Sequence, residues 1–131
     1  MGNTLKAGNV KLKRAYEHAA AGDGPRILID RLWPRGVRKA DAAIDQWVKD
    51  IAPSTSLRKW FGHDPARWQE FRRRYAEEVY AHPEQLGRLR ALARQGPLTL
   101  VYSAHDEFHN DAVALRGLLL GSQTSRRRKL A

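Results

Sequence analysis

Leu98–Tyr102 (LTLVY) is a short and almost continuously apolar run that is rich in β-forming residues. Arg26–Trp33 contains a second run of the same kind, ILI at positions 27–29. Such runs are typical of strands that are covered on both faces, as in a parallel sheet. Helical patterns separate the two runs, so we expect a small three-layer α/β domain with a short, largely parallel sheet flanked by helices.

The segment Val10–Tyr16 predicts a further strand with one solvent-facing side. Its apolar residues Val10, Leu12 and Tyr16 are interspersed with lysines. This alternation is typical of a strand at the edge of a sheet. The pattern leaves the direction of the strand open.

The first helix is expected between the two apolar runs. Ile44, Trp47, Val48 and Ile51 have the i, i+3, i+4, i+7 spacing of an amphipathic helix, and Pro53 marks its end.

The helices that follow have clear start and stop signals. A short element spans Ser56–Phe61, and Asp64–Pro65 supplies an N-cap and a first-turn proline for the next helix. Pro83 opens a further helix, which Gly96 closes. The apolar positions that define the three longer helices are Trp68, Phe71, Tyr75 and Val79, then Leu86, Leu89 and Leu92, and finally Ala112, Leu115 and Leu119.

The chain has 131 residues, the length of one ordinary domain, and no cysteine. The lack of cysteine excludes a disulfide scaffold, a thiol nucleophile and cysteine-ligated metal sites. No apolar run approaches the roughly 18 residues that span a bilayer, and the N-terminus lacks the apolar core of a signal peptide. We therefore expect a cytoplasmic protein with a flexible N-terminus at 1–9, a single α/β domain at 10–120 and a basic C-terminal tail at 121–131.

The net charge is strongly positive. Twenty-four lysines and arginines against fourteen acidic residues give +10. Four of these cations, Arg126–Lys129, lie in the C-terminal tail, and without them the body carries about +6. An excess of arginine suits phosphate, carboxylate or nucleic-acid partners, because the guanidinium binds an oxyanion through two hydrogen bonds.

Polar residues follow the second expected strand, at Asp30–Arg38. In open α/β sheets, ligands bind beyond the carboxyl ends of the strands. Arg31 and Arg35 can form an oxyanion clamp there, with Gly36 letting the backbone approach the ligand. In the alternative interpretation, Asp30 pairs with Arg31 and the remaining arginines are solvated.

A second polar segment, Tyr102–Asn110, follows the last expected strand. His105 and His109 are four residues apart, but the sequence offers no third metal ligand near them. Asp106 is placed either as the N-cap of the last helix or, with His109, as a group for proton transfer. Ser103 does not lie in a nucleophile elbow.

A third segment, Trp60–Pro65, contains His63 next to the expected helix cap. Its aromatic residues fit packing roles as well as ligand binding. The imidazole of His63 faces either a pocket or water.

Three stretches resemble the YeaO-like family of bacterial proteins, a domain of unknown function. They are 30–36 (DRLWPRG), 57–65 (LRKWFGHDP) followed by Trp68 and Phe71, and Asp106 with His109–Asn110. The likeness runs from about Val10 to Leu120. It implies a compact α/β fold and a cytoplasmic bacterial protein, without an established reaction. Longer relatives carry cysteines where this chain has Tyr102–Asn110, so no thiol mechanism carries over.

We expect these stretches to meet at the carboxyl edge of the sheet and to bind a small anionic ligand. Whether a reaction follows, which cofactor takes part and how the chain oligomerises are left open, and no metal is expected. A nucleic-acid-associated or regulatory protein that uses its basic surface and tail is the alternative, and steep salt dependence would distinguish it. The candidate catalytic residues are Asp30, His63, Asp106 and His109. The candidate ligand-binding residues are Arg31, Trp33, Arg35, Gly36, Trp60, Tyr102, Ser103 and Asn110.

Overall fold

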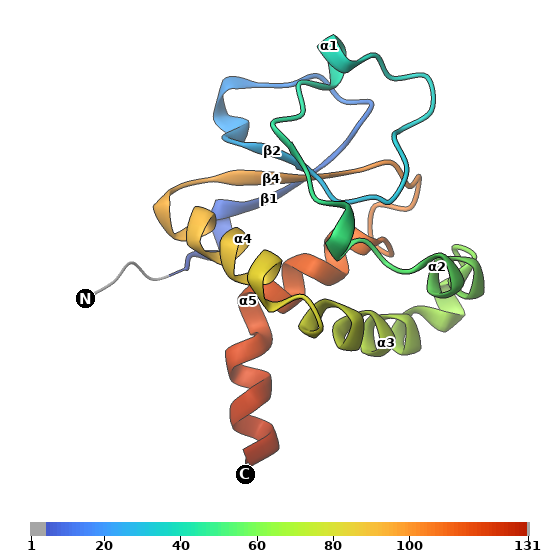
Figure 1. The fold of residues 1–131 in the computed structure, drawn as a ribbon, viewed down its shortest axis with the longest axis vertical. Helices are drawn as coiled ribbons and strands as arrows, with labels where there is room; N and C mark the ends of the chain where they lie inside the picture. Colours follow the sequence, from blue (N-terminus) through green and yellow to red (C-terminus); the bar gives the residue numbers. More distant parts are fainter. Residues whose placement is uncertain (1–4, 131) are drawn as a thin grey trace.

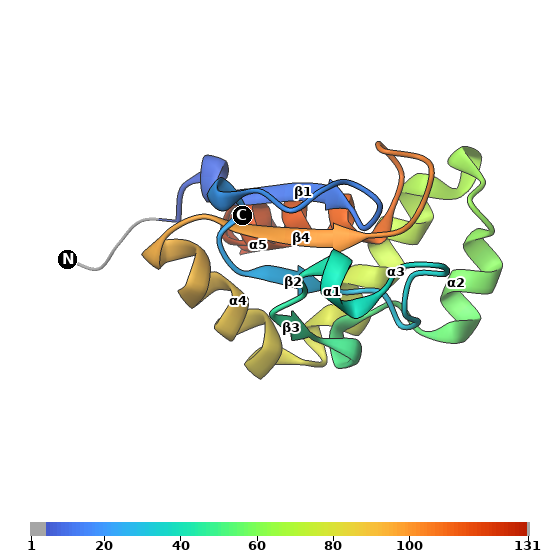
Figure 2. The ribbon, with the colours of Figure 1, turned by 90° about the horizontal axis from the view of Figure 1, so that it is seen from above.

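The computed structural model describes the backbone of residues 5–130 and the side chains of residues 5–121. Its sheet has four parallel strands in the order β1-β4-β2-β3 (Figure 2). The expected α/β class and parallel sheet are confirmed. The strands are β1 (Val10–Arg14), β2 (Arg26–Leu28), β3 (Gln46–Trp47) and β4 (Leu98–Tyr102).

Helices surround this sheet. In Figure 1, α4 and α5 lie against one face, whereas α1 lies on the opposite side. The α-helices are α1 (Lys39–Ala42), α2 (Thr55–Phe61), α3 (Trp68–Tyr80), α4 (Pro83–Gln95) and α5 (Asp111–Leu130). Short 3-10 turns are η1 (Ala7–Asn9), η2 (Ala21–Asp23), η3 (Lys49–Ile51) and η4 (Pro65–Arg67).

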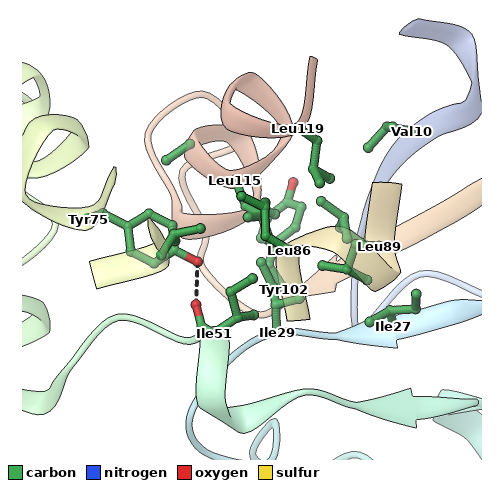
Figure 3. Packing of buried hydrophobic residues seen from close by; sticks show 14 of the residues in the cluster. Val10, Ile27, Ile29, Ile51, Tyr75, Leu86, Leu89, Tyr102, Leu115 and Leu119 are labelled. Atoms are coloured by element: carbon green, nitrogen blue, oxygen red, sulfur yellow. Dashed lines mark hydrogen bonds between the residues drawn. The ribbon is translucent and has the colours of Figure 1, made fainter. Parts of the chain in front are cut away.

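The larger core lies between the sheet and helices α3, α4 and α5 (Figure 3). Tyr75 is fully buried in it and donates a hydrogen bond from its hydroxyl to the carbonyl of Ile51, at 2.7 Å. A smaller cluster of Ala15, Leu28 and Val101 covers the other face, together with half-buried Trp33, Ile44 and Trp47. The layer on this second face is therefore thin, since it consists of α1 and adjoining loops.

β4 is one of the two interior strands and is buried along its whole length. Leu100 pairs with Leu12 on one side and with Ile27 on the other. β1 lies at the edge, as its alternating pattern predicts, and it runs parallel to β4. The strand ends at Arg14, so Tyr16 lies beyond it and is exposed.

The helix predicted over residues 44–51 is wrong. The segment instead forms β3 and η3, because the Asp45 and Val48 amides donate to backbone carbonyls of β2. Its four apolar residues serve opposite faces of the sheet: Ile44 and Trp47 join the smaller cluster, and Val48 and Ile51 join the larger core. A helical spacing is thus produced here by a short strand followed by a turn.

The other helices lie near their predicted positions: α2 begins at Thr55, one residue before the expected start, and α4 has the predicted limits Pro83 and Gly96. The Asp64 carboxylate accepts from the Ala66 amide at 3.0 Å, and Pro65 opens the turn that leads into α3. Gly96 ends α4, and its amide donates the last hydrogen bond of the helix to the Leu92 carbonyl. Within residues 5–130, no helix combines the length and the apolar character needed to cross a membrane.

Candidate functional site

The centre of the site is the junction of β2 and β4 at the carboxyl edge of the sheet. Asp30 follows β2, and Ser103 follows β4. One carboxylate oxygen of Asp30 accepts from the Ser103 amide at 3.0 Å and from the Ser103 hydroxyl at 2.8 Å. The Ser103 hydroxyl, a candidate ligand-binding group, therefore serves to fix the Asp30 side chain.

A second carboxyl group, that of Asp111 at the start of α5, lies against Asp30. Desolvation, the negative charge of Asp30 and a hydrogen bond between the two side chains raise the pKa of Asp111 well above its usual range. Asp111 therefore keeps its proton to a higher pH than an ordinary carboxyl group. The negative charge of Asp30 at this centre opposes the binding of an anion beside it.

In the first predicted segment, the Arg31 guanidinium is bound to backbone carbonyls. Arg31 donates from Nε to the Pro53 carbonyl at 3.2 Å and from Nη2 to the Ala52 carbonyl at 3.4 Å. These bonds attach the segment to the chain just before α2. The predicted Asp30–Arg31 pair does not form, since each side chain has the partners given above.

The remainder of this segment forms a turn. The side chain of Arg35 is exposed, while its carbonyl accepts from the Tyr16 hydroxyl at 3.1 Å. Gly36 has a φ of 79°, a left-handed conformation that favours glycine. Trp33 donates to the Val37 carbonyl at 2.6 Å and is partly buried, which makes it a fixed wall of the turn.

The loop between β4 and α5 is organised by Asp106. Its carboxylate accepts from the amides of Phe108 at 2.9 Å and of His109 at 3.1 Å, and it binds His109 Nδ1 at 2.9 Å. These bonds hold the pKa of Asp106 below its usual range, and the bond from the Phe108 amide has the largest effect. Asp106 does not cap α5: that role belongs to Asn110, whose side-chain oxygen accepts from the Val113 amide at 2.9 Å.

The two histidines of this loop have different surroundings. His109 lies edge-on to the Trp68 ring, with centroids 5.3 Å apart. His105 is exposed, and its Nδ1 is 3.5 Å from Nη2 of Arg14. Both precede α5, so they do not share a helix face, and the described residues contain no group of three potential metal ligands. Tyr102 is buried within β4, 4% exposed, away from any ligand in solution.

The three predicted segments converge on one structure, the α2–α3 hairpin (residues 54–80). Figure 2 shows α2 beyond the carboxyl ends of the strands. Arg31 holds the chain that enters the hairpin, and His109 contacts Trp68 at the start of α3. Inside the hairpin, Phe61 stacks on Phe71 with centroids 4.4 Å apart. The quoted motifs therefore anchor the hairpin to the edge of the sheet.

Towards solvent, the hairpin presents arginines around one tryptophan. The guanidinium of Arg74 lies 4.3 Å from the Trp60 ring centroid, and that of Arg67 lies 5.3 Å from it. Arg67 also donates to the Trp60 carbonyl. The exposed and half-exposed residues of this region are together called the hairpin surface. They are Arg58, Lys59, Trp60, His63, Arg67 and Arg74.

A groove of about 550 Å³ runs between α2 and α3 beside Trp60. Its lining residues are Ser56, Leu57, Trp60, Arg74, Glu77 and Glu78. Glu78 accepts from the Ser54 amide at 2.7 Å and from its hydroxyl at 2.6 Å, which fixes this wall of the groove.

His63 has a φ of 58°, directly after Gly62 with a φ of 54°. A left-handed conformation costs a residue other than glycine about 1–2 kcal/mol. Among the described residues, the exposed His63 side chain has a tilted ring contact with Phe61 alone, at 6.3 Å between centroids. Strain of this kind at an exposed side chain is typical of functional loops.

Sequence reasoning missed Asp111, Arg67 and Arg74. Asp111 is the residue after the predicted segment Tyr102–Asn110, and its position at the start of the last helix was the available signal. Arg74 lies on the solvent side of the amphipathic helix α3, and Arg67 ends the turn η4. The sequence pattern indicates that Arg74 is exposed, but it does not identify the Trp60 ring as the contact of either arginine.

The fold and its anchors define a small α/β protein whose parallel sheet is capped at the carboxyl edge by a helical hairpin. The chain belongs to the family described as the inactive DUF488-N3 subclade, which matches residues 9–130. The resemblance to YeaO-like proteins is thereby confirmed. No solved structure matches the chain.

Two relatives illustrate this membership. The chain is similar to "Uncharacterized protein YeaO" of Escherichia coli (strain K12), with 46% identity over 82% of this chain and 93% of the relative. It is also similar to "Uncharacterized protein Rv3073c" of Mycobacterium tuberculosis (strain ATCC 25618 / H37Rv), with 40% identity over 86% of this chain and 94% of the relative.

Proposed function

We propose that this protein binds a phosphate-rich anionic ligand on the hairpin surface and acts as a binding protein rather than an enzyme. The observation that carries the proposal is the pair Arg58 and Lys59 beside Trp60. Both cations are exposed, and neither forms an ion pair with any described residue. Cations without a carboxylate partner are free to bind phosphate.

Charge favours the hairpin over the centre of the sheet edge. The hairpin, residues 54–80, contains six lysines and arginines and four carboxylates, and Arg58 and Lys59 have no carboxylate partner among the described residues. At the centre, Asp30 and Asp111 place two carboxyl groups together, and Arg31 is already bound to two backbone carbonyls. A small anion in a pocket at that centre would have to compete with these groups, whereas an anion on the hairpin meets exposed cations.

A binding role agrees with the description of the family as inactive. The net charge of +10 supports an anionic partner, because a positive surface raises the rate of encounter with polyanions.

The test is binding of fluorescently labelled inorganic polyphosphate at several salt concentrations. We expect the affinity to fall log-linearly as salt increases. The double variant Arg58→Gln/Lys59→Gln should bind more weakly and reduce the salt slope by about 1.5, since each lost phosphate contact removes about 0.7–0.9.

The matched control is Lys39→Gln/Arg88→Gln, which removes the same charge from exposed positions on α1 and α4. It should leave most of the affinity in place. Equal losses in the two double variants would show that only net charge matters, and absence of polyphosphate binding at low salt would refute the proposal.

A further inference from the structure

The groove between α2 and α3 points to a more specific ligand. We infer that it is a nucleobase subsite, so that the hairpin surface binds single-stranded nucleic acid. This inference rests on the proposed function, because the phosphates of the strand would contact the same cations.

Trp60 supplies the stacking platform. Its ring lines the groove, and Arg67 fixes its backbone through a hydrogen bond to the Trp60 carbonyl. The guanidinium of Arg74 also lines the groove, 4.3 Å from the ring centroid. Because this guanidinium lies over the indole, a base in the groove would stack on the uncovered part of the ring or on the guanidinium plane itself. An indole held in place makes such stacking possible at little entropic cost.

The groove has the size and the polar groups that a base requires. Its volume of about 550 Å³ lies within the usual range for small-molecule sites. Leu57 offers apolar contact, Ser56 a hydroxyl group and Glu77 a carboxylate that can accept from a base amino group. Glu77 is exposed and is held by Arg73 at 2.9 Å.

The lining also favours a base over an acidic peptide. Glu77 and Glu78 would repel carboxylate side chains, whereas a neutral base that carries an amino group is a donor to such oxygens. A paired base in a duplex does not present its ring face, so stacking on Trp60 requires an unpaired base.

The experiment compares three probes on the full chain: an oligodeoxyadenylate of about 12 nucleotides, an abasic strand of the same length, and polyphosphate. We expect the oligodeoxyadenylate to bind at least about tenfold more tightly than the abasic strand, which is the scale of one stacked base. Trp60→Leu should erase this difference, whereas Trp60→Phe should keep most of it.

The outcomes separate the inference from the proposed function. Equal binding of the base-containing and abasic strands to the unmodified protein overturns the inference, while polyphosphate binding still supports the proposed function. Loss of all binding overturns both. Equal affinity for a duplex, or for poly-glutamate, also overturns the inference. Because the first comparison uses the unmodified chain, it stands even if Trp60→Leu fails to fold.

Discussion

At the scale of single residues, His63 shows a conflict between stability and exposure. It adopts a left-handed conformation although it is not glycine, and its side chain points to solvent. Within the described part of the chain, the tilted contact with Phe61 is the one side-chain contact of His63 that could offset the backbone strain. The residue therefore belongs to the positions at which a protein trades stability for the presentation of a side chain.

Replacing His63 by glycine should therefore stabilise the fold. We expect His63→Gly to raise the free energy of unfolding by about 0.5–1 kcal/mol, because relief of strain exceeds the entropy that glycine adds to the unfolded chain. Gly62→Ala should lower it by about 1–2 kcal/mol, since its φ of 54° disfavours a Cβ atom. Urea denaturation measures both, and a destabilised His63→Gly would contradict the assignment of strain.

Asp111 leads to a prediction about pH. Its pKa is raised in the folded state, so the folded protein binds more protons than the unfolded chain above about pH 3.9. This group therefore stabilises the fold least at high pH: its contribution is present in acid and is lost as pH rises from about 4 towards the folded-state pKa.

Asp111→Asn should remove that dependence, because an amide donates to Asp30 as the protonated carboxyl group does. The difference in unfolding free energy between variant and wild type should grow in favour of the variant as pH rises from about 4 to 8. Subtracting the stability curve of the wild type from that of the variant removes the contributions of other titrating groups. Glu70 is one of them, because Arg73 and Arg74 lower its pKa to about 2. A difference that stays constant with pH would contradict the raised pKa.

The same residues show what a sequence can reveal about a site. The motif positions Asp30, Arg31 and His109 were predicted to meet near the sheet edge, and strand ends in a parallel sheet suffice for that inference. Their partners were not predictable. Arg31 binds the carbonyls of Ala52 and Pro53, and no residue-type pattern identifies a backbone acceptor 21 or 22 positions away.

At the scale of elements, the strands and most helices follow from the sequence because burial and capping act locally. β4 coincides with the predicted run, and Asp64–Pro65 opens the turn into α3. The segment 44–51 escaped prediction because its pairing partner is β2, a contact that lies outside any local window. Two residues of pairing were enough to override the helical spacing.

Trp68 is the element-level test of the hairpin. It is half-buried and touches Phe61, Phe71 and His109, whereas Phe71 is buried to 2% exposure. We expect Phe71→Ala to cost about 3–5 kcal/mol and Trp68→Ala about 2, since truncation costs scale with burial. Denaturant titration measures the loss of unfolding free energy in each variant. A larger loss for Trp68→Ala than for Phe71→Ala would show that the hairpin is held mainly by its contacts at the sheet edge.

For the whole molecule, the basic C-terminal segment is expected to add affinity without adding selectivity. Truncation after Gly121 removes Arg126–Lys129 and should reduce the salt slope for duplex DNA by up to about 3.6. The preference for a base-containing strand over an abasic strand should stay unchanged, because Trp60 lies in the hairpin.

The control for this truncation is the melting temperature. An unchanged value would show that the fold does not depend on residues 122–131. Loss of the base preference together with intact folding would move the nucleobase subsite away from the α2–α3 groove.

The strand order β1-β4-β2-β3 affects how the chain can fold while it is being synthesised on the ribosome. β1 and β2 both pair with β4, which is the last strand to be synthesised, and Val10 must wait for Leu98. Pairing over so many residues raises the contact order and slows folding. Until Tyr102 has left the ribosome, the earlier strands have unpaired edges, so a nascent chain that stalls before this point is exposed to aggregation and depends on chaperones.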